Sequence, residues 1–159
     1  MRRICVSVIG SSSATPQELA WAEEVGRLLA RNNLVLICGG RGGVMEAACR
    51  GAKSADGLTV GILPVADREA GNDFLDVVIP TGIGYARNAI VAYSGHAVIA
   101  IGGSSGTLSE MAYATIRNIP VVTLGSWRLD ERRLSHGSRP FPAASPAEAV
   151  EKVLELVRG

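Results

Sequence analysis

Two glycine-rich turns are the features of this sequence best suited to chemistry. Each follows an apolar run and consists of two glycines, two further residues and another glycine that opens a helical pattern. The first turn contains Gly39, Gly40, Arg41, Gly42 and Gly43, and the second contains Gly102, Gly103, Ser104, Ser105 and Gly106. A strand that turns through glycines into a helix leaves backbone N–H groups at the positive end of the helix dipole, where phosphate and other anions bind.

A third turn of small residues follows the first apolar run of the chain and contains Gly10, Ser11 and Ser12. In a parallel sheet all three turns lie at the carboxyl edge, where ligands bind at the switch point of the strand order. We therefore predict that they form one site for a phosphorylated ligand. The alternative is that the glycines only allow helices to pack tightly on strands.

Three side chains near these turns can act on such a ligand. Thr107 follows the second turn, and Glu110 lies about one helical turn further on the same face. A carboxylate there can orient a ribose hydroxyl, act as a base or stabilise an oxocarbenium-like charge, or simply favour the first turn of its helix. Arg87 begins another helix at the same edge, where it can clamp a phosphate, pair with Glu110 or remain on the surface.

Several cofactors are disfavoured by the motifs. Neither turn has the G-x-G-x-x-G pattern of dinucleotide binding or the G-K-[ST] of a P-loop, so we expect neither NAD chemistry nor ATP hydrolysis. The two lysines, Lys53 and Lys152, lie within predicted helices, which argues against pyridoxal phosphate. The three cysteines are far apart in sequence, so we expect reduced thiols, no metal site and a cytoplasmic protein.

The elements that position these residues alternate between strand and helix. The capping boxes that begin at Thr15 and Ser145 each precede a helix. Strands are predicted over 4–9, 34–38, 58–63, 76–79, 97–101 and 121–124, and helices over 16–32, 43–54, 84–93, 107–118 and 146–157. This alternation predicts one domain over residues 1–159, a three-layer Rossmann-like α/β fold whose mostly parallel sheet is covered by helices on both faces. Residues 125–144 are the least regular, and we expect an ordered loop or a cover over the site, with disorder as the alternative.

Composition narrows the possible partners. The 159 residues carry a net charge of +1, and only 4% are aromatic. A basic surface or a base-stacking platform is therefore not expected, and neither is nucleic acid as a partner. The apolar run near the start is too short to span a membrane.

Together these residues resemble the LOG-like superfamily, once labelled "lysine decarboxylase-like", over about residues 4–125. Its hydrolases cleave nucleoside 5′-monophosphates, and their opening G-S-S matches Gly10-Ser11-Ser12. Their P-G-G-x-G-T-x-x-E motif aligns with residues 102–110, with Gly102 in place of the proline and Ser104 in place of a glycine. Their Arg-Lys pair corresponds to Arg87-Asn88, so the lysine is missing. The resemblance implies that Arg87 and Glu110 are the catalytic residues if the chain is a hydrolase.

The departures from the hydrolase pattern resemble a second branch, the molybdenum-cofactor carrier-like proteins. The strings that carry this resemblance are residues 39–46, 61–64 and 70–72. The branch implies a homo-oligomer that binds a phosphorylated pterin without consuming it. Two functions stay open: a carrier of a phosphorylated heterocycle, with molybdenum cofactor first, and a nucleoside 5′-monophosphate phosphoribohydrolase. The changes at 102–104 and at Asn88 favour the carrier.

Overall fold

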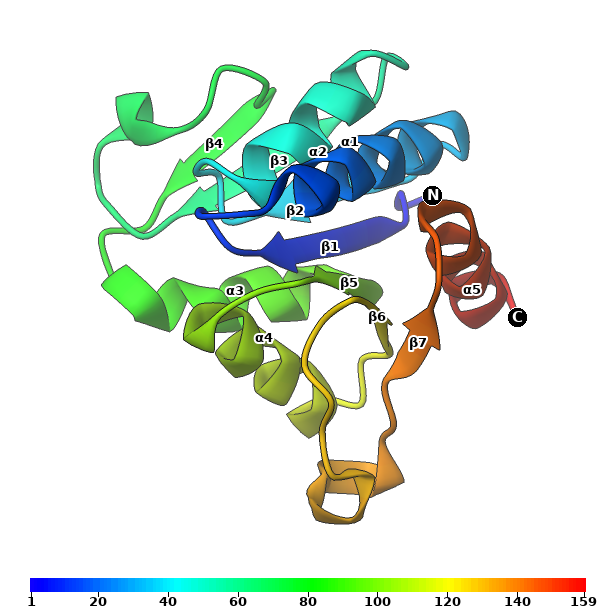
Figure 1. Ribbon diagram of the computed structural model, residues 1–159. Helices are drawn as coiled ribbons and strands as arrows, with labels where there is room; N and C mark the ends of the chain where they lie inside the picture. The colour runs from blue at the N-terminus through cyan, green and yellow to red at the C-terminus, as the bar shows by residue number, and fades with distance from the viewer.

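The fold is built on one seven-stranded sheet (Figure 1). The computed structural model describes all residues from 1 to 159. The strands follow the order β4-β3-β2-β1-β5-β6-β7, and every pair of neighbours is parallel. Their bounds are β1 Cys5–Gly10, β2 Val35–Cys38, β3 Thr59–Leu63, β4 Val77–Pro80, β5 Ala97–Ile101, β6 Val121–Leu124 and β7 Phe141–Ala143. The predicted Rossmann-like architecture is confirmed.

Helices cover both faces of this sheet (Figure 1). Their bounds are α1 Pro16–Arg31, α2 Val44–Lys53, α3 Arg87–Ser94, α4 Ser105–Ile116 and α5 Pro146–Arg158. One apolar core joins α1, α2 and α5 to alternate residues of the strands, and a second core joins α3 and α4 to the residues between them. The alternation of side chains along each strand therefore explains why the sheet has two covered faces.

Both predicted capping boxes begin helices as expected. The hydroxyl oxygen of Thr15 accepts a hydrogen bond from the backbone N–H of Glu18, and Ser145 accepts one from Glu148. The largest local difference lies in residues 125–144, which contain the short edge strand β7 as well as irregular chain. Pro142 removes a backbone donor within that strand, so its sequence does not read as a strand.

The closest helix packing is between α1 and α2. A Cβ added at Gly26 would lie 1.9 Å from the carbonyl oxygen of Ala48, and one added at Gly51 would lie 1.8 Å from that of Glu23. Only glycine fits at these two positions, because any side chain would push the helices apart. The contact fixes α2 against α1 and thereby holds the first glycine turn in place. None of the helices is long and apolar enough to cross a membrane.

Candidate ligand-binding site

The candidate site lies where the strand order reverses. β1 and β5 are neighbours in the sheet, but β1 leads to α1 on one face and β5 leads to α4 on the other. This divergence opens a cavity of about 520 Å³ at the carboxyl edge. It is lined by residues from the end of β1 and the turn after it, from α2, from α3 and the turn before it, and from α4 and its N-cap, namely Gly10, Ser11, Ser12, Met45, Tyr85, Arg87, Asn88, Ser104, Ser105, Gly106, Thr107, Ser109 and Glu110.

The first turn of α4 supplies free hydrogen-bond donors to this cavity. Ser104 is the N-cap residue, but its side chain accepts no hydrogen bond from the helix. The backbone N–H groups of Ser105, Gly106 and Thr107 donate to no other group of the chain. The residue Thr107 is only 2% exposed, and its buried hydroxyl oxygen also has no partner. Buried polar groups are rarely left without a partner. This turn therefore offers a set of donors to an anionic group.

Arg87 brings a positive charge to the cavity from α3. Its Nη2 donates to the carbonyl oxygen of Gly39 at 3.3 Å, and its Nη1 donates to the side chain of Asn88. Its Nε is buried and has no partner. Burial lowers the pKa of Arg87, an effect that the nearby Glu110 opposes. A half-buried guanidinium with an unused donor suits an anionic acceptor.

A chain of hydrogen bonds connects Arg87 to the second glycine turn. Asn88 donates from Nδ2 to the hydroxyl of Ser109 at 3.1 Å, and that hydroxyl donates to the carbonyl oxygen of Gly106 at 2.6 Å. Asn88 is 3% exposed, so its amide serves to fix the neighbouring groups. These contacts hold α3 and α4 in one arrangement around the cavity.

Glu110 is the buried acid of the site. The residue is 6% exposed, and its side chain makes no hydrogen bond with the rest of the chain. Burial raises its pKa to about 8, although the positive charge of Arg87 acts in the opposite direction. At neutral pH the free protein therefore holds Glu110 mainly in its protonated form. A protonated carboxyl group can donate a hydrogen bond to a ligand and leaves the charge of Arg87 uncompensated.

The first glycine turn is not part of the cavity lining, and several of its backbone groups are used within the chain. Gly39 accepts the hydrogen bond from Arg87, and the N–H of Gly40 donates to the sulfur of Cys38 at 3.3 Å. Asn72 donates from its backbone to Gly40 and from its side chain to the carbonyl oxygen of Arg41.

The backbone N–H of the first residue of α2 is also hydrogen-bonded within the chain. Gly43, with a φ of +64°, packs against Ser11 and Ser12, and the N–H of Val44 donates to Ser11 at 3.0 Å. The structure thus brings the turn after β1, the second glycine turn, Arg87 and Glu110 together. It does not bring Gly39, Gly40, Arg41, Gly42 or Gly43 into the same cavity. A direct role of these five residues in ligand binding stays a prediction.

Gly102 and Gly103 shape the second turn without lining the cavity. Both have positive φ angles, of +54° and +108°. A Cβ added at Gly103 would lie 2.5 Å from the side chain of Thr107. Met45, Tyr85 and Ser109 also line the cavity and are not predicted from the sequence, because their approach to it depends on the packing of separate helices. The spacing of Ser109 four residues after Ser105 was the one signal that could have identified it.

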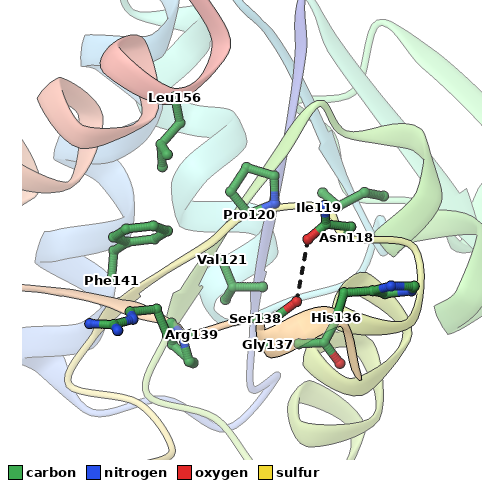
Figure 2. A pocket seen from close by; sticks show the side chains of 12 residues that line it. Asn118, Ile119, Pro120, Val121, His136, Gly137, Ser138, Arg139, Phe141 and Leu156 are labelled. Atoms are coloured by element: carbon green, nitrogen blue, oxygen red, sulfur yellow. Dashed lines mark hydrogen bonds between the residues drawn. The ribbon is translucent and has the colours of Figure 1, made fainter. Parts of the chain in front are cut away.

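Residues 125–144 support the second turn at one end and form a separate cavity at the other. Ser126 donates from its hydroxyl to the carbonyl oxygen of Gly102, and Trp127 donates from Nε1 to that of Ser104 at 3.0 Å. Further on, His136 and Ser138 line a cavity of about 290 Å³ (Figure 2). In this cavity the hydroxyl of Ser138 donates a hydrogen bond to Oδ1 of Asn118 at 3.4 Å. This second cavity borders the first residue of β6, so it lies at the opposite edge of the sheet from the glycine turns.

The family model and the similar solved structures point to the same family of proteins. Residues 3–151 match the model of the SLOG cluster4 family. The structure of the molybdenum cofactor binding protein from Rippkaea orientalis is 38% identical, with a TM-score of 0.89 and 99% of each chain covered. The molybdenum cofactor carrier protein from Chlamydomonas reinhardtii is 36% identical, also with a TM-score of 0.89, and the match covers 99% of this chain and 100% of that one.

A third relative is a named enzyme. The cytokinin riboside 5′-monophosphate phosphoribohydrolase of Rhodococcoides fascians is 33% identical over 113 residues. The match covers 65% of this chain and 57% of that protein. The similarity therefore spans little more than half of the enzyme's length.

Proposed function

Because the chain belongs to the SLOG cluster4 family, we propose that it binds a phosphorylated heterocyclic ligand in the cavity between β1 and β5 and carries it without cleaving it. The family membership confirms the LOG-like resemblance, and the two molybdenum cofactor proteins among the solved structures support its carrier branch. We propose a molybdopterin-type cofactor as the first candidate ligand.

The observation that carries this proposal is the set of unsatisfied donors at the start of α4. Ser105 to Thr107, which carry the free N–H groups and the unpartnered hydroxyl of Thr107, line the cavity together with Arg87, whose Nε is unused. A phosphate has enough acceptor oxygens to satisfy several of these donors at once. The cavity volume of about 520 Å³ is in the range of small-molecule sites, so it also has room for a heterocycle.

Calorimetric titration with AMP, GMP and molybdenum cofactor tests this proposal. We expect at least one of them to bind, and the Thr107→Val variant to bind that ligand about tenfold more weakly, because a hydrogen bond to a charged group is lost. Thr123→Val is the matched control, since Thr123 is a buried threonine on β6 outside the cavity. Absence of binding by all three ligands, or equal affinities of the two variants, would contradict the proposal.

The second candidate function is hydrolysis of a nucleoside 5′-monophosphate. The specific observation in its favour is that Arg87 and Glu110 line the same cavity as the free α4 donors. With its pKa raised to about 8, Glu110 carries a proton at neutral pH and can donate it to a leaving base. The named relative from Rhodococcoides fascians also supports this candidate.

Chromatography of AMP after incubation with the protein separates the two candidates. A hydrolase releases free adenine, and its Glu110→Ala variant does not. A carrier leaves AMP intact even at high protein concentration. Free adenine produced by the wild type and not by the variant would replace the carrier proposal with the hydrolase.

We also propose that the chain forms a homo-oligomer, a dimer or a tetramer. α3 and α4 expose the apolar side chains of Ile90, Tyr93 and Ile116, which are 40%, 42% and 50% exposed. Large apolar side chains grouped on neighbouring helices are typical of an interface. Light scattering tests this, and a monomer at micromolar concentration would contradict it.

A further inference from the structure

Two cysteines that are far apart in sequence lie together next to the first glycine turn. The sulfur atoms of Cys38, at the end of β2, and Cys49, within α2, are 3.5 Å apart. Both residues are fully buried. The thiols are free, but their separation exceeds the length of a disulfide bond by only about 1.5 Å. A small movement of the two side chains would therefore allow a covalent bond.

The surroundings give the two sulfur atoms different chemistry. The N–H of Gly40 donates to the Cys38 sulfur at 3.3 Å, and the Cys49 thiol is a further hydrogen-bonding neighbour. This hydrogen bond from Cys49 lowers the pKa of Cys38, with further help from Gly40 and the positive charge of Arg87, and together these outweigh the opposing effects of burial and Glu110. The same pairing raises the pKa of Cys49. Cys38 is thus the better nucleophile, and Cys49 is placed to react with it afterwards.

We propose that Cys38 and Cys49 form a redox modification site that a small peroxide converts to a reversible disulfide when the first glycine turn opens, since both thiols are buried in the closed protein. The Cys38 thiolate attacks one oxygen of hydrogen peroxide, the O–O bond breaks, and hydroxide leaves to give a sulfenic acid. The Cys49 thiol then attacks this sulfur, an S–S bond forms, and the sulfenic hydroxyl leaves as water with the thiol proton. Two thiols and one peroxide thus give one disulfide and two waters, and an added dithiol restores the thiols.

The pair is connected to the candidate ligand site through the first glycine turn. Cys38 directly precedes Gly39, whose carbonyl oxygen accepts the hydrogen bond from Arg87 at 3.3 Å. Movement of the Cys38 sulfur toward Cys49 also removes the acceptor of the Gly40 N–H. Oxidation therefore shifts the turn that positions Arg87. This coupling rests on the proposed function, and we expect the oxidised protein to bind its phosphorylated ligand about tenfold more weakly.

Mass spectrometry of the full chain tests the modification directly. The Cys5→Ser protein is treated with hydrogen peroxide, freed of peroxide, denatured and alkylated. This substitution removes the third thiol, which is partly exposed and lies outside both the pair and the cavity. We expect a product lighter by two hydrogen atoms that takes up no alkylating reagent and regains both thiols in dithiothreitol. Two alkylated thiols after treatment, or a sulfinic acid without a disulfide, would overturn the proposal.

Two further measurements keep the proposal separate from the ligand hypothesis. The variant that also carries Cys49→Ala is expected to yield no disulfide and to retain an oxidised Cys38. The reduced and oxidised forms are then titrated with AMP, GMP and molybdenum cofactor. A disulfide with unchanged ligand affinity would overturn the coupling between the two sites. If the reduced protein binds none of the three, the proposed function fails, while the mass measurement still decides whether the cysteine pair is a redox site.

Discussion

Replacing Glu110 with glutamine tests whether a buried carboxyl group destabilises the free protein. Glu110 is 6% exposed, and burial raises its pKa from an ordinary value of 4.5 to about 8, against the opposing effect of Arg87. Between these two values the folded protein retains the proton while the unfolded chain releases it. The folded state therefore binds more protons than the unfolded state, and its stability falls as pH rises through this window.

The magnitude follows from the two pKa values. At about 1.36 kcal/mol for each pKa unit, a rise from 4.5 to about 8 corresponds to a loss of up to about 5 kcal/mol when ionisation is complete. Below the lower value the carboxyl group is neutral in both states, and this loss disappears. Glutamine has a similar size and stays neutral throughout. We therefore expect the two proteins to be about equally stable near pH 4, and Glu110→Gln to be the more stable by up to about 5 kcal/mol near pH 9.

Urea unfolding of the two proteins at several pH values measures this difference. Glu151→Gln is the matched control, because Glu151 is exposed on α5 and makes no hydrogen bond through its side chain. The control should leave the pH dependence of the wild type unchanged. If Glu110→Gln differs from the wild type by the same free energy near pH 4 and near pH 9, Glu110 does not titrate as the structure indicates.

The remaining predictions concern the ligand and the packing of the helices. Ligand affinity in the wild type should fall from about pH 7 to about pH 9, since ionised Glu110 then competes for Arg87, and Glu110→Gln should abolish that fall in calorimetry. Gly106→Val should reduce ligand affinity at least tenfold, because the added side chain blocks the close approach of the phosphate to the backbone. The fold should persist, because a Cβ at Gly106 would meet only Asn88, at 3.7 Å. Unchanged affinity would refute the position of the phosphate. Gly26→Ala should lower the free energy of unfolding by about 2–4 kcal/mol in urea, because its Cβ would overlap Ala48; an unchanged midpoint would show that α1 and α2 adjust freely.

The strands, the helices and their parallel arrangement could be predicted because local patterns determine them. The capping boxes at Thr15 and Ser145 predict helix starts that the structure confirms. β7 could not be predicted, since a three-residue strand that contains Pro142 depends on pairing with β6. Its register is set by tertiary contacts and not by its own sequence.

The residues of the candidate site that follow strand ends could be predicted from the sequence. Those whose position depends on the packing of separate elements could not. The turn after β1, the second glycine turn, Arg87 and Glu110 meet because parallel strands bring their carboxyl ends to one edge. Sequence spacing does not show that Asn72, which lies in a separate loop, donates hydrogen bonds to the carbonyl oxygens of the first glycine turn.

The same limit applies to the thiols. Cys38 and Cys49 are eleven positions apart, and only the packing of α2 on β2 brings their sulfur atoms to 3.5 Å. The three thiols are free, as expected, but distance along the chain says little about distance in space, so the sequence does not show that two of them are neighbours.

A crystal structure of the protein with a bound phosphorylated ligand would show whether the start of α4 binds the phosphate. We expect a phosphate oxygen within hydrogen-bond distance of the backbone N–H groups of Gly106 and Thr107, with the Thr107 hydroxyl as a further donor and the heterocycle in the cavity beside Arg87. A ligand bound in the cavity beside His136, or one whose phosphate points away from the start of α4, would contradict it.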